Sequence, residues 1–182
     1  MSATGESNDA YSGMLGTFPY AFRASDSRLF RSYVVVGGLL AAGLALLFGF
    51  ALVVLVGHTV GVGGATFSFS RAFLVLIGLA VVAPVVAPVV LVARTHRRGE
   101  STDGTDAAHA LAGYLFLASL YLGAVVGMPD CFVLDGQRTC PSAQPGVFQP
   151  VVHALYALSD TVGVVPPLVA VAIILAVHRR LS

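Results

Sequence analysis

The chain has 182 residues, of which 57% are hydrophobic and 10% are charged; its formal net charge is +1 and its mean hydropathy is +0.86. Soluble domains carry about 25% charged residues, so this composition excludes an ordinary soluble domain. The low net charge and the absence of a basic stripe exclude a nucleic-acid-binding protein, and the apolar content excludes disorder over most of the chain. The class that remains is an integral membrane protein.

Residues 1–32 are predicted to form a cytoplasmic leader. Residues 1–10 are polar and typical of a disordered segment. Residues 19–24 predict a short helix on the inner membrane surface, because Pro19 suits a first helical turn and the neighbouring aromatic side chains anchor at interfaces. The first apolar run begins only at residue 33 and is too long for a signal peptide, so we expect it to remain as an uncleaved anchor.

Four apolar runs are long enough to cross a bilayer core of about 30 Å, which requires about 20 helical residues. They cover residues 33–57, 72–93, 108–128 and 151–177. None shows the alternation of a membrane barrel strand, and helices satisfy their own backbone groups in lipid. The sequence therefore predicts an all-α membrane domain of four transmembrane helices over residues 33–182.

The arginines predict the orientation of these spans. All ten basic residues are arginine, and eight lie on one side of the predicted membrane: Arg23, Arg28, Arg31, Arg94, Arg97, Arg98, Arg179 and Arg180. Only Arg71 and Arg138 lie on the other side. Because positive residues favour the cytoplasmic side, we expect a multi-pass protein of the plasma membrane with both termini in the cytoplasm.

Two cysteines lie in the predicted outer loop, residues 129–150. The outer side is usually oxidising, so Cys131 and Cys140 are expected to form a disulfide. Such a bond would close a short loop and contribute about 2.5–3 kcal/mol. A redox-active pair is the less favoured alternative, because the C-x-x-C spacing is absent.

Residues 75–98 align without a gap to residues 157–180. Pro84 then matches Pro166, and both segments end in His-Arg-Arg. The match suggests two parallel two-helix repeats related about the membrane normal.

Prolines interrupt the second and fourth spans and predict a kink in each. They are Pro84, Pro88, Pro166 and Pro167. Proline removes a backbone donor, and the resulting kink either opens room for a ligand or has a purely structural role, which is favoured here.

A polar stripe near the outer end of the fourth span is the strongest candidate site. Asp160 lies within the apolar run, and an intramembrane carboxylate costs at least about 2.5–3.5 kcal/mol, so it needs a partner. His153 and Tyr156 share its helical face, while His58 ends the first span and Arg71 starts the second span on the same side of the membrane. These five residues predict either an outer-leaflet polar pocket or a buried contact that fixes helix packing.

The five histidines are candidate haem or metal ligands only where two of them lie at matched membrane depth. Only His58 and His153 lie at matched depth, whereas His96 and His178 are interpreted as parts of the basic cytoplasmic ends, and His109 lies near the inner face. No metal site, cofactor or catalytic residue is assigned.

The segments LGTFPYAFRASDSRLFRSYVVVGGLL, FSFSRAF and LVARTHRR resemble small uncharacterised multi-pass membrane proteins of haloarchaea. That resemblance implies a plasma-membrane location and carries no functional residue with it. Four spans with an outer cysteine pair are also similar to quinone-linked thiol oxidoreductases, but those need a second cysteine pair that this chain lacks.

The favoured function is a non-enzymatic accessory or scaffold subunit, embedded in the lipid bilayer as a homo-oligomer or within a larger complex. The first alternative is a small transporter or channel that uses the kinked second and fourth spans with Asp160. The second alternative is a haem- or quinone-linked membrane redox protein.

Overall fold

The computed structural model describes residues 13–59, 65–99, 102–127, 132–134, 137–139, 158 and 160–181. The elements are α1 (Gly13–Ala24), α2 (Arg28–Thr59), α3 (Ala65–Arg98), α4 (Asp103–Val126), β1 (Phe132–Leu134), β2 (Gln137–Thr139), the 3₁₀ helix η1 (Asp160–Val164) and α6 (Val165–Leu181). Within these residues, four helical segments are long and apolar enough to cross a membrane. The all-α, four-helix membrane class predicted from composition is therefore confirmed.

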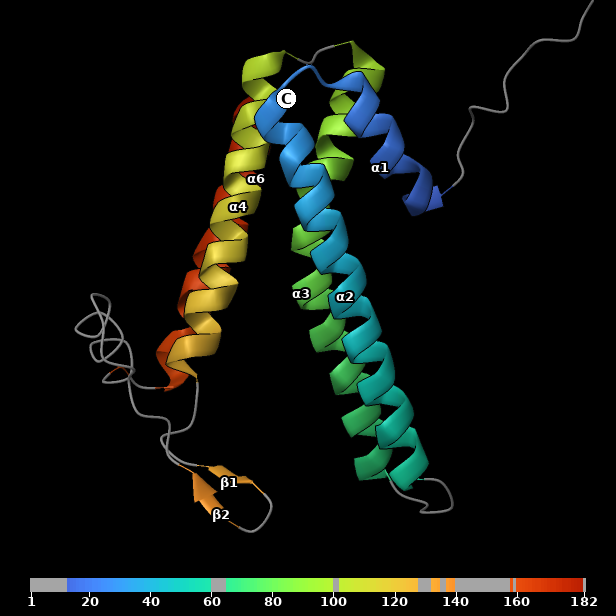
Figure 1. Ribbon diagram of the computed structural model, residues 1–182, viewed down its shortest axis with the longest axis vertical. Helices are drawn as coiled ribbons and strands as arrows, with labels where there is room; N and C mark the ends of the chain where they lie inside the picture. The colour runs from blue at the N-terminus through green and yellow to red at the C-terminus, as the bar shows by residue number, and fades with distance from the viewer. Residues whose placement is uncertain are drawn as a thin grey trace, which may run out of the picture.

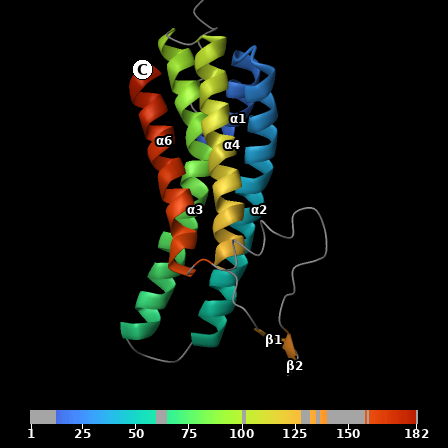
Figure 2. The same ribbon diagram turned by 90° about the vertical axis from the view of Figure 1, so that its left-hand side faces the viewer.

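Two helical hairpins form the molecule. Helix α2 packs along α3, and α4 packs along α6; Figure 1 shows the two hairpins meeting at one end and diverging toward the other. The turned view in Figure 2 shows α2 and α3 extending beyond the ends of α4 and α6. This difference follows from their lengths, since α2 has 32 residues and α4 has 24.

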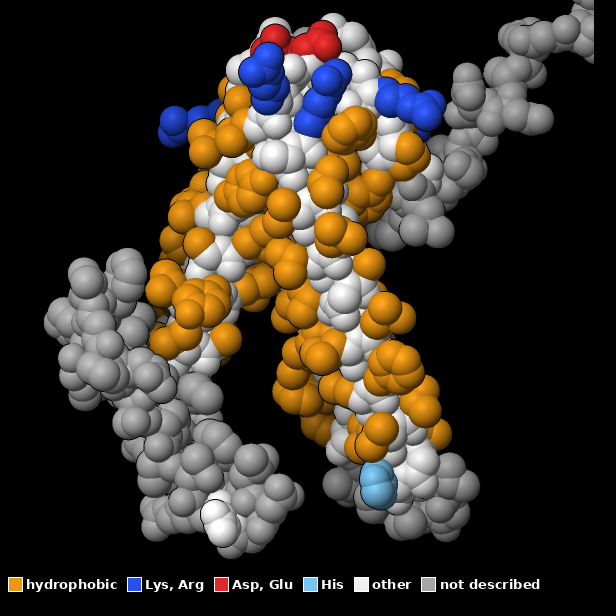
Figure 3. All heavy atoms as spheres, viewed as in Figure 1, with side chains coloured by type: hydrophobic (Ala, Val, Ile, Leu, Met, Phe, Trp, Pro, Cys, Tyr) orange, Lys and Arg blue, Asp and Glu red, His pale blue; other side chains and the backbone are white. Residues whose placement is uncertain are grey.

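The end where the hairpins meet is the arginine-rich end predicted from the sequence. Helices α1, α3 and α6 finish there and α2 begins there, so the eight arginines in the first turn of α2 and near the ends of α1, α3 and α6 gather on one side. Figure 3 shows basic and acidic side chains concentrated at this end, above flanks covered by hydrophobic side chains. We call it the arginine end.

The helices continue past the apolar runs that predicted them. Helix α3 reaches Arg98 and stops at Gly99, whose φ of 72° is the left-handed conformation that commonly terminates helices. Helix α4 then begins at Asp103 after the N-cap Thr102, which exchanges side-chain and backbone hydrogen bonds with Thr105. Helices α3 and α4 therefore extend into residues 94–107, between the second and third apolar runs, because hydropathy does not report where caps form.

Helix α1 is longer than the predicted residues 19–24. It begins at Gly13 and includes Pro19 in its interior, although proline cannot donate the usual backbone hydrogen bond. Packing outweighs this cost: Ala21 is fully buried, and the Phe18 ring lies against Gly38 of α2. Helix α1 therefore packs on the bundle instead of only resting on the membrane surface.

The two proline pairs have different positions. Pro84 and Pro88 lie inside α3, as predicted. Pro166 and Pro167 instead lie in the first turn of α6, directly after η1, so they begin an α-helix rather than interrupt one. First-turn N–H groups have no partner within the helix, which makes proline acceptable there. The predicted start of that span, residues 151–157, lies outside the described residues.

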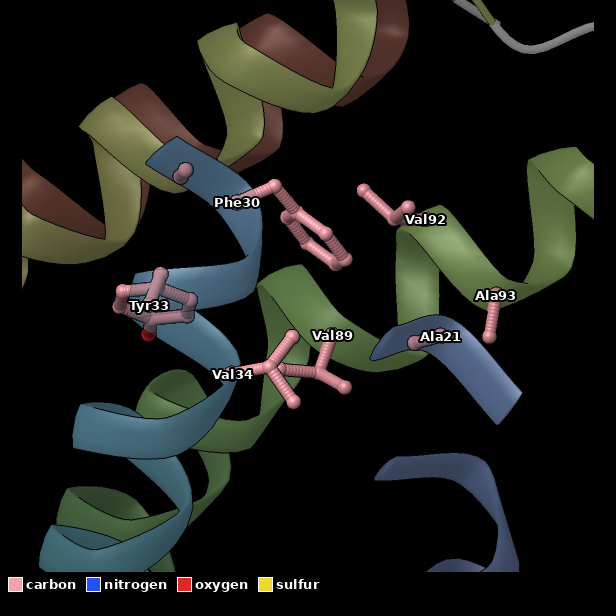
Figure 4. Packing of buried hydrophobic residues seen from close by; sticks show 8 residues of the cluster. Ala21, Phe30, Tyr33, Val34, Val89, Val92 and Ala93 are labelled. Carbon is pink, nitrogen blue, oxygen red and sulfur yellow. The ribbon is translucent and has the colours of Figure 1, made fainter. Parts of the chain in front are cut away.

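One buried hydrophobic core lies near the arginine end. Phe30, Tyr33 and Val34 of α2 meet Val89 and other buried residues of α3, as Figure 4 shows. The remaining members of this cluster are Ala21, Val92, Ala93 and Ala110. A second cluster continues it along α3, α4 and α6 and includes Val85, Phe116 and Ile174.

Tyr33 joins α2, α3 and α4 at one point. Its hydroxyl donates a 2.7 Å hydrogen bond to the carbonyl of Val85, one turn before Pro88. Its ring lies edge-on to Tyr114, with centroids 5.2 Å apart, and occupies the space that a side chain at Gly113 would need. The contacts of Tyr33 with α3 and α4 therefore help to fix how the two hairpins pack where they meet.

Candidate functional site

The predicted outer pocket is only partly within the described residues. His153 and Tyr156 lie outside them, as do Cys131 and Cys140, and the side chain of Asp160 is not described. His58 is exposed near the end of α2. The pocket and the disulfide therefore stay predictions.

Arg71 has a defined role at the outer end of the first hairpin. Its guanidinium donates to the Thr59 hydroxyl at 3.1 Å and to the Thr59 carbonyl at 3.0 Å. This carbonyl belongs to the last turn of α2, where helix carbonyls lack partners and a positive charge is favourable. Arg71 thus caps α2 and holds it to α3.

Asp160 begins η1, which packs against α4 and α6. The approach is close, because a Cβ atom at Gly123 of α4 would lie 2.5 Å from the carbonyl oxygen of Gly163. Among the described residues, η1 makes no contact with α2 or α3. The structure brings His58 and Arg71 to one hairpin and Asp160 to the other.

A buried polar cluster at the arginine end was not predicted. We define the histidine–aspartate cluster as His96, Asp106, His109 and His178, contributed by α3, α4 and α6. His96 Nε2 lies 2.8 Å from Asp106 Oδ2, and this pair bridges the two hairpins. The Asp106 side chain is 1% exposed and that of His96 is 19% exposed. A carboxylate so fully removed from water requires a charged or hydrogen-bonding partner.

His109 occupies the next turn of α4 on the same face. Its Nδ1 lies 2.8 Å from the carbonyl oxygen of Thr105, and the residue is 1% exposed. Its ring packs edge-on against His178 of α6, with centroids 6.1 Å apart. The cluster therefore joins three helices through imidazole and carboxylate groups.

Two atoms of the cluster are buried without a hydrogen-bond partner among the described residues. They are Asp106 Oδ1 and His109 Nε2. An unsatisfied buried polar atom costs about 1–3 kcal/mol, so such atoms call for an explanation. Within the described part of the chain, no group of three or more His, Cys, Asp or Glu side chains is arranged to hold a metal ion.

Two sequence signals could have located this cluster. The segment TDGTD contains the cap that places Asp106 in the first turn of α4, where the helix dipole favours a negative charge. The repeated His-Arg-Arg motif supplies two histidines of the cluster. His96 pairs with Asp106, and His178 packs against His109. From the sequence alone, the His-Arg-Arg motif indicates only a basic helix end.

The whole chain, residues 1–182, matches one family model, described as Domain of unknown function (DUF8056). The chain belongs to the DUF8056 family. No curated protein and no solved structure matches this DUF8056 chain. Its function must therefore be argued from its own geometry.

Proposed function

We propose that this DUF8056 protein is a non-enzymatic accessory or scaffold subunit of the plasma membrane, which assembles through its first hairpin. The observation that carries the proposal is the exposure of α2: only 6% of its most apolar eighteen-residue window is buried. Lipid tails are as apolar as the exposed side chains of α2, so exposure alone does not drive this helix to associate. Association in the membrane needs a surface shaped to pack closely against another helix.

The outer half of the first hairpin offers such a surface. A groove of about 220 Å³ runs between α2 and α3, with small residues Ala45, Gly49 and Gly78 and larger walls that include Phe48 and Leu79. Small residues let helix backbones approach closely in membranes. We infer that a further transmembrane helix, from a second copy or from a larger complex, packs into this groove.

Photocrosslinking in the native membrane tests this proposal. A photoreactive residue at Leu79, which lines the groove and is 61% exposed, should yield a discrete protein adduct. The matched control is Leu168 on α6, which is 63% exposed and should yield mainly lipid adducts. Equal protein adducts at both positions, or none at Leu79, would contradict the scaffold proposal. Mass spectrometry of the adduct distinguishes a second copy from a different partner.

Filling the groove provides a second test. A Cβ atom at Gly49 would meet no atom within 4 Å, so Gly49→Leu should leave the fold intact. It should reduce the Leu79 adduct several-fold, because the added side chain occupies the space of the incoming helix. An unchanged adduct would mean that the groove is not the docking surface.

The same proposal places the arginine end in the cytoplasm. Its support is the gathering of eight arginines at one end of the described helices, to which the positive-inside rule applies. A reporter that is active only in the cytoplasm, fused after Ser182, should be active in intact cells. The same reporter inserted after Gly61, between α2 and α3, should be inactive.

A further inference from the structure

Two arginine–aromatic pairs connect α1 to the first hairpin at the arginine end. The Arg97 guanidinium of α3 lies over the Tyr20 ring, 5.0 Å from its centroid, and the Arg31 guanidinium of α2 lies over the Phe22 ring at 5.7 Å. Both rings belong to α1 and stay partly exposed, Tyr20 at 38% and Phe22 at 40%. Each pair therefore holds α1 in place and is also open to a ligand.

Helix α1 has one face on the bundle and one face turned outward. Ala21 is fully buried, whereas Tyr20, Phe22 and Arg23 are exposed. Within the described ranges, α1 packs on α2 and α3 and on no other element, and Figure 1 shows it on the flank of the bundle. We define the α1 surface as Tyr20, Phe22, Arg23, Arg31 and Arg97.

The α1 surface is positively charged, and one of its arginines is held by further contacts. Helix α1 contains no acidic residue. Asp26, in the connection to α2, has a side chain that is 87% exposed, and its Oδ1 lies 3.5 Å from Arg31 Nη2. One aspartate against three arginines leaves an excess of two positive charges. Arg31 Nε also donates a 2.8 Å hydrogen bond to the Ser25 carbonyl, and a side chain already held in place loses less freedom when it binds an anion.

Helix length places this surface at the level of the lipid headgroups. Helix α2 has 32 residues and is about 48 Å long, so its ends extend beyond a hydrocarbon core of about 30 Å. Helix α1 packs beside the arginine end of α2, where Figure 3 shows basic side chains above hydrophobic flanks. Aromatic rings commonly anchor helices at this boundary, and long basic side chains reach from it to the polar headgroups.

We propose that the α1 surface binds the headgroup of an anionic phospholipid in the leaflet at the arginine end. Its arginines supply guanidinium groups, whose planar donors match phosphate oxygens. The excess of positive charge favours a headgroup with a net negative charge over a zwitterionic one. The lipid's acyl chains cover the exposed Tyr20 and Phe22 rings, which a free phosphate ion leaves bare. The proposal is independent of the accessory role, because it concerns a lipid and not a protein partner.

Amide hydrogen exchange of the full-length protein in lipid nanodiscs tests the proposal. The two membranes compared are phosphatidylcholine alone and an equimolar mixture of phosphatidylcholine with the anionic lipid phosphatidylglycerol. A bound headgroup stabilises α1 on the bundle, so exchange over residues 13–24 should be slower in the mixture. The expected ratio is at least about fivefold, the effect of one arginine at a charged membrane surface. Equal exchange in the two membranes would overturn the proposal, and this comparison requires no variant to fold.

Two double variants separate a site at α1 from the general charge of the arginine end. Arg23→Gln with Arg97→Gln should abolish the difference between the two membranes. The matched control is Arg179→Gln with Arg180→Gln, which removes two exposed arginines of α6 at the same end and should preserve the difference. Equal loss in both double variants would show a diffuse charge effect and overturn the site. If the arginines only hold α1 in place, the first double variant speeds exchange equally in both membranes and leaves their ratio unchanged, which also contradicts the proposal.

Inorganic phosphate distinguishes a lipid from a free anion. Added to the phosphatidylcholine nanodiscs, it should leave exchange over residues 13–24 unchanged, because a free ion does not cover the two aromatic rings. Slowing equal to that caused by phosphatidylglycerol would show that the α1 surface takes free phosphate, which would contradict a lipid site.

Discussion

The contact between Tyr33 and Gly113 should be the most sensitive point of the helix packing. A Cβ atom at position 113 would lie 2.3 Å from Tyr33 Cζ and 2.6 Å from its hydroxyl oxygen. Real Cβ atoms do not approach this closely, so Gly113→Ala must displace the Tyr33 ring. The ring is fully buried and is held by its hydrogen bond to Val85, so it has no free space in which to move.

The magnitude follows from three contributions. Overpacking a well-packed core costs about 1–3 kcal/mol, and loss of the Tyr33 hydrogen bond adds about 1 kcal/mol. Replacing glycine by alanine within a helix returns up to about 1 kcal/mol. We therefore expect Gly113→Ala to lower the free energy of unfolding by about 1–3 kcal/mol.

The assay is reversible unfolding in micelles or bicelles, with Gly43→Ala as the matched control. Gly43 is also in a membrane helix, but a Cβ atom there meets nothing within 4 Å, so this variant should be neutral or slightly stabilised. A double-mutant cycle identifies the cause: in a Tyr33→Leu background, Gly113→Ala should cost much less. If the two alanine variants unfold alike, or if the cost persists without the Tyr33 ring, the steric argument is refuted.

Three further predictions concern the helix ends. Gly123→Val should separate η1 from α4, because the new side chain would clash with the Gly163 carbonyl, a backbone group that cannot rotate away. Amide hydrogen exchange over residues 160–164 should therefore become faster. An unchanged exchange rate would contradict the contact between Gly123 and Gly163. Arg71→Gln should increase exchange in the last turn of α2, where Thr59 loses its cap, while exchange at the arginine end remains unchanged. Thr102→Ala should destabilise α4 by about 1 kcal/mol in the same unfolding assay, and an unchanged stability would show that the capping box is dispensable.

The sequence by itself determined the class of the molecule and the number of its spans. Helices in lipid need only length and apolar composition, both of which are local properties. The gathering of the arginines at one end of the bundle was predictable for the same reason, because every helix end carries its own charge pattern along the chain. Pro84 and Pro88 could likewise be placed within a helix by counting residues.

Helix ends required more than hydropathy. The capping box at Thr102 and the left-handed Gly99 are local features, and they set the ends of α3 and α4 within the polar segment between the second and third apolar runs. Helix α1 includes Pro19 because Phe18 and Ala21 find tertiary partners, which overrides the local preference. These contacts join segments that are distant in sequence, so periodicity could not reveal them.

Only the tertiary structure decided where the chemistry lies. Asp106 and His109 resemble ordinary polar residues of a helix start, yet α3 and α6 cover them and remove them from water. Arg71 resembled a member of a polar pocket, yet it caps the helix that precedes it. Burial and hydrogen-bond partners depend on which helices pack together, and that packing is set by contacts such as Tyr33 with Gly113, which no single stretch of sequence contains.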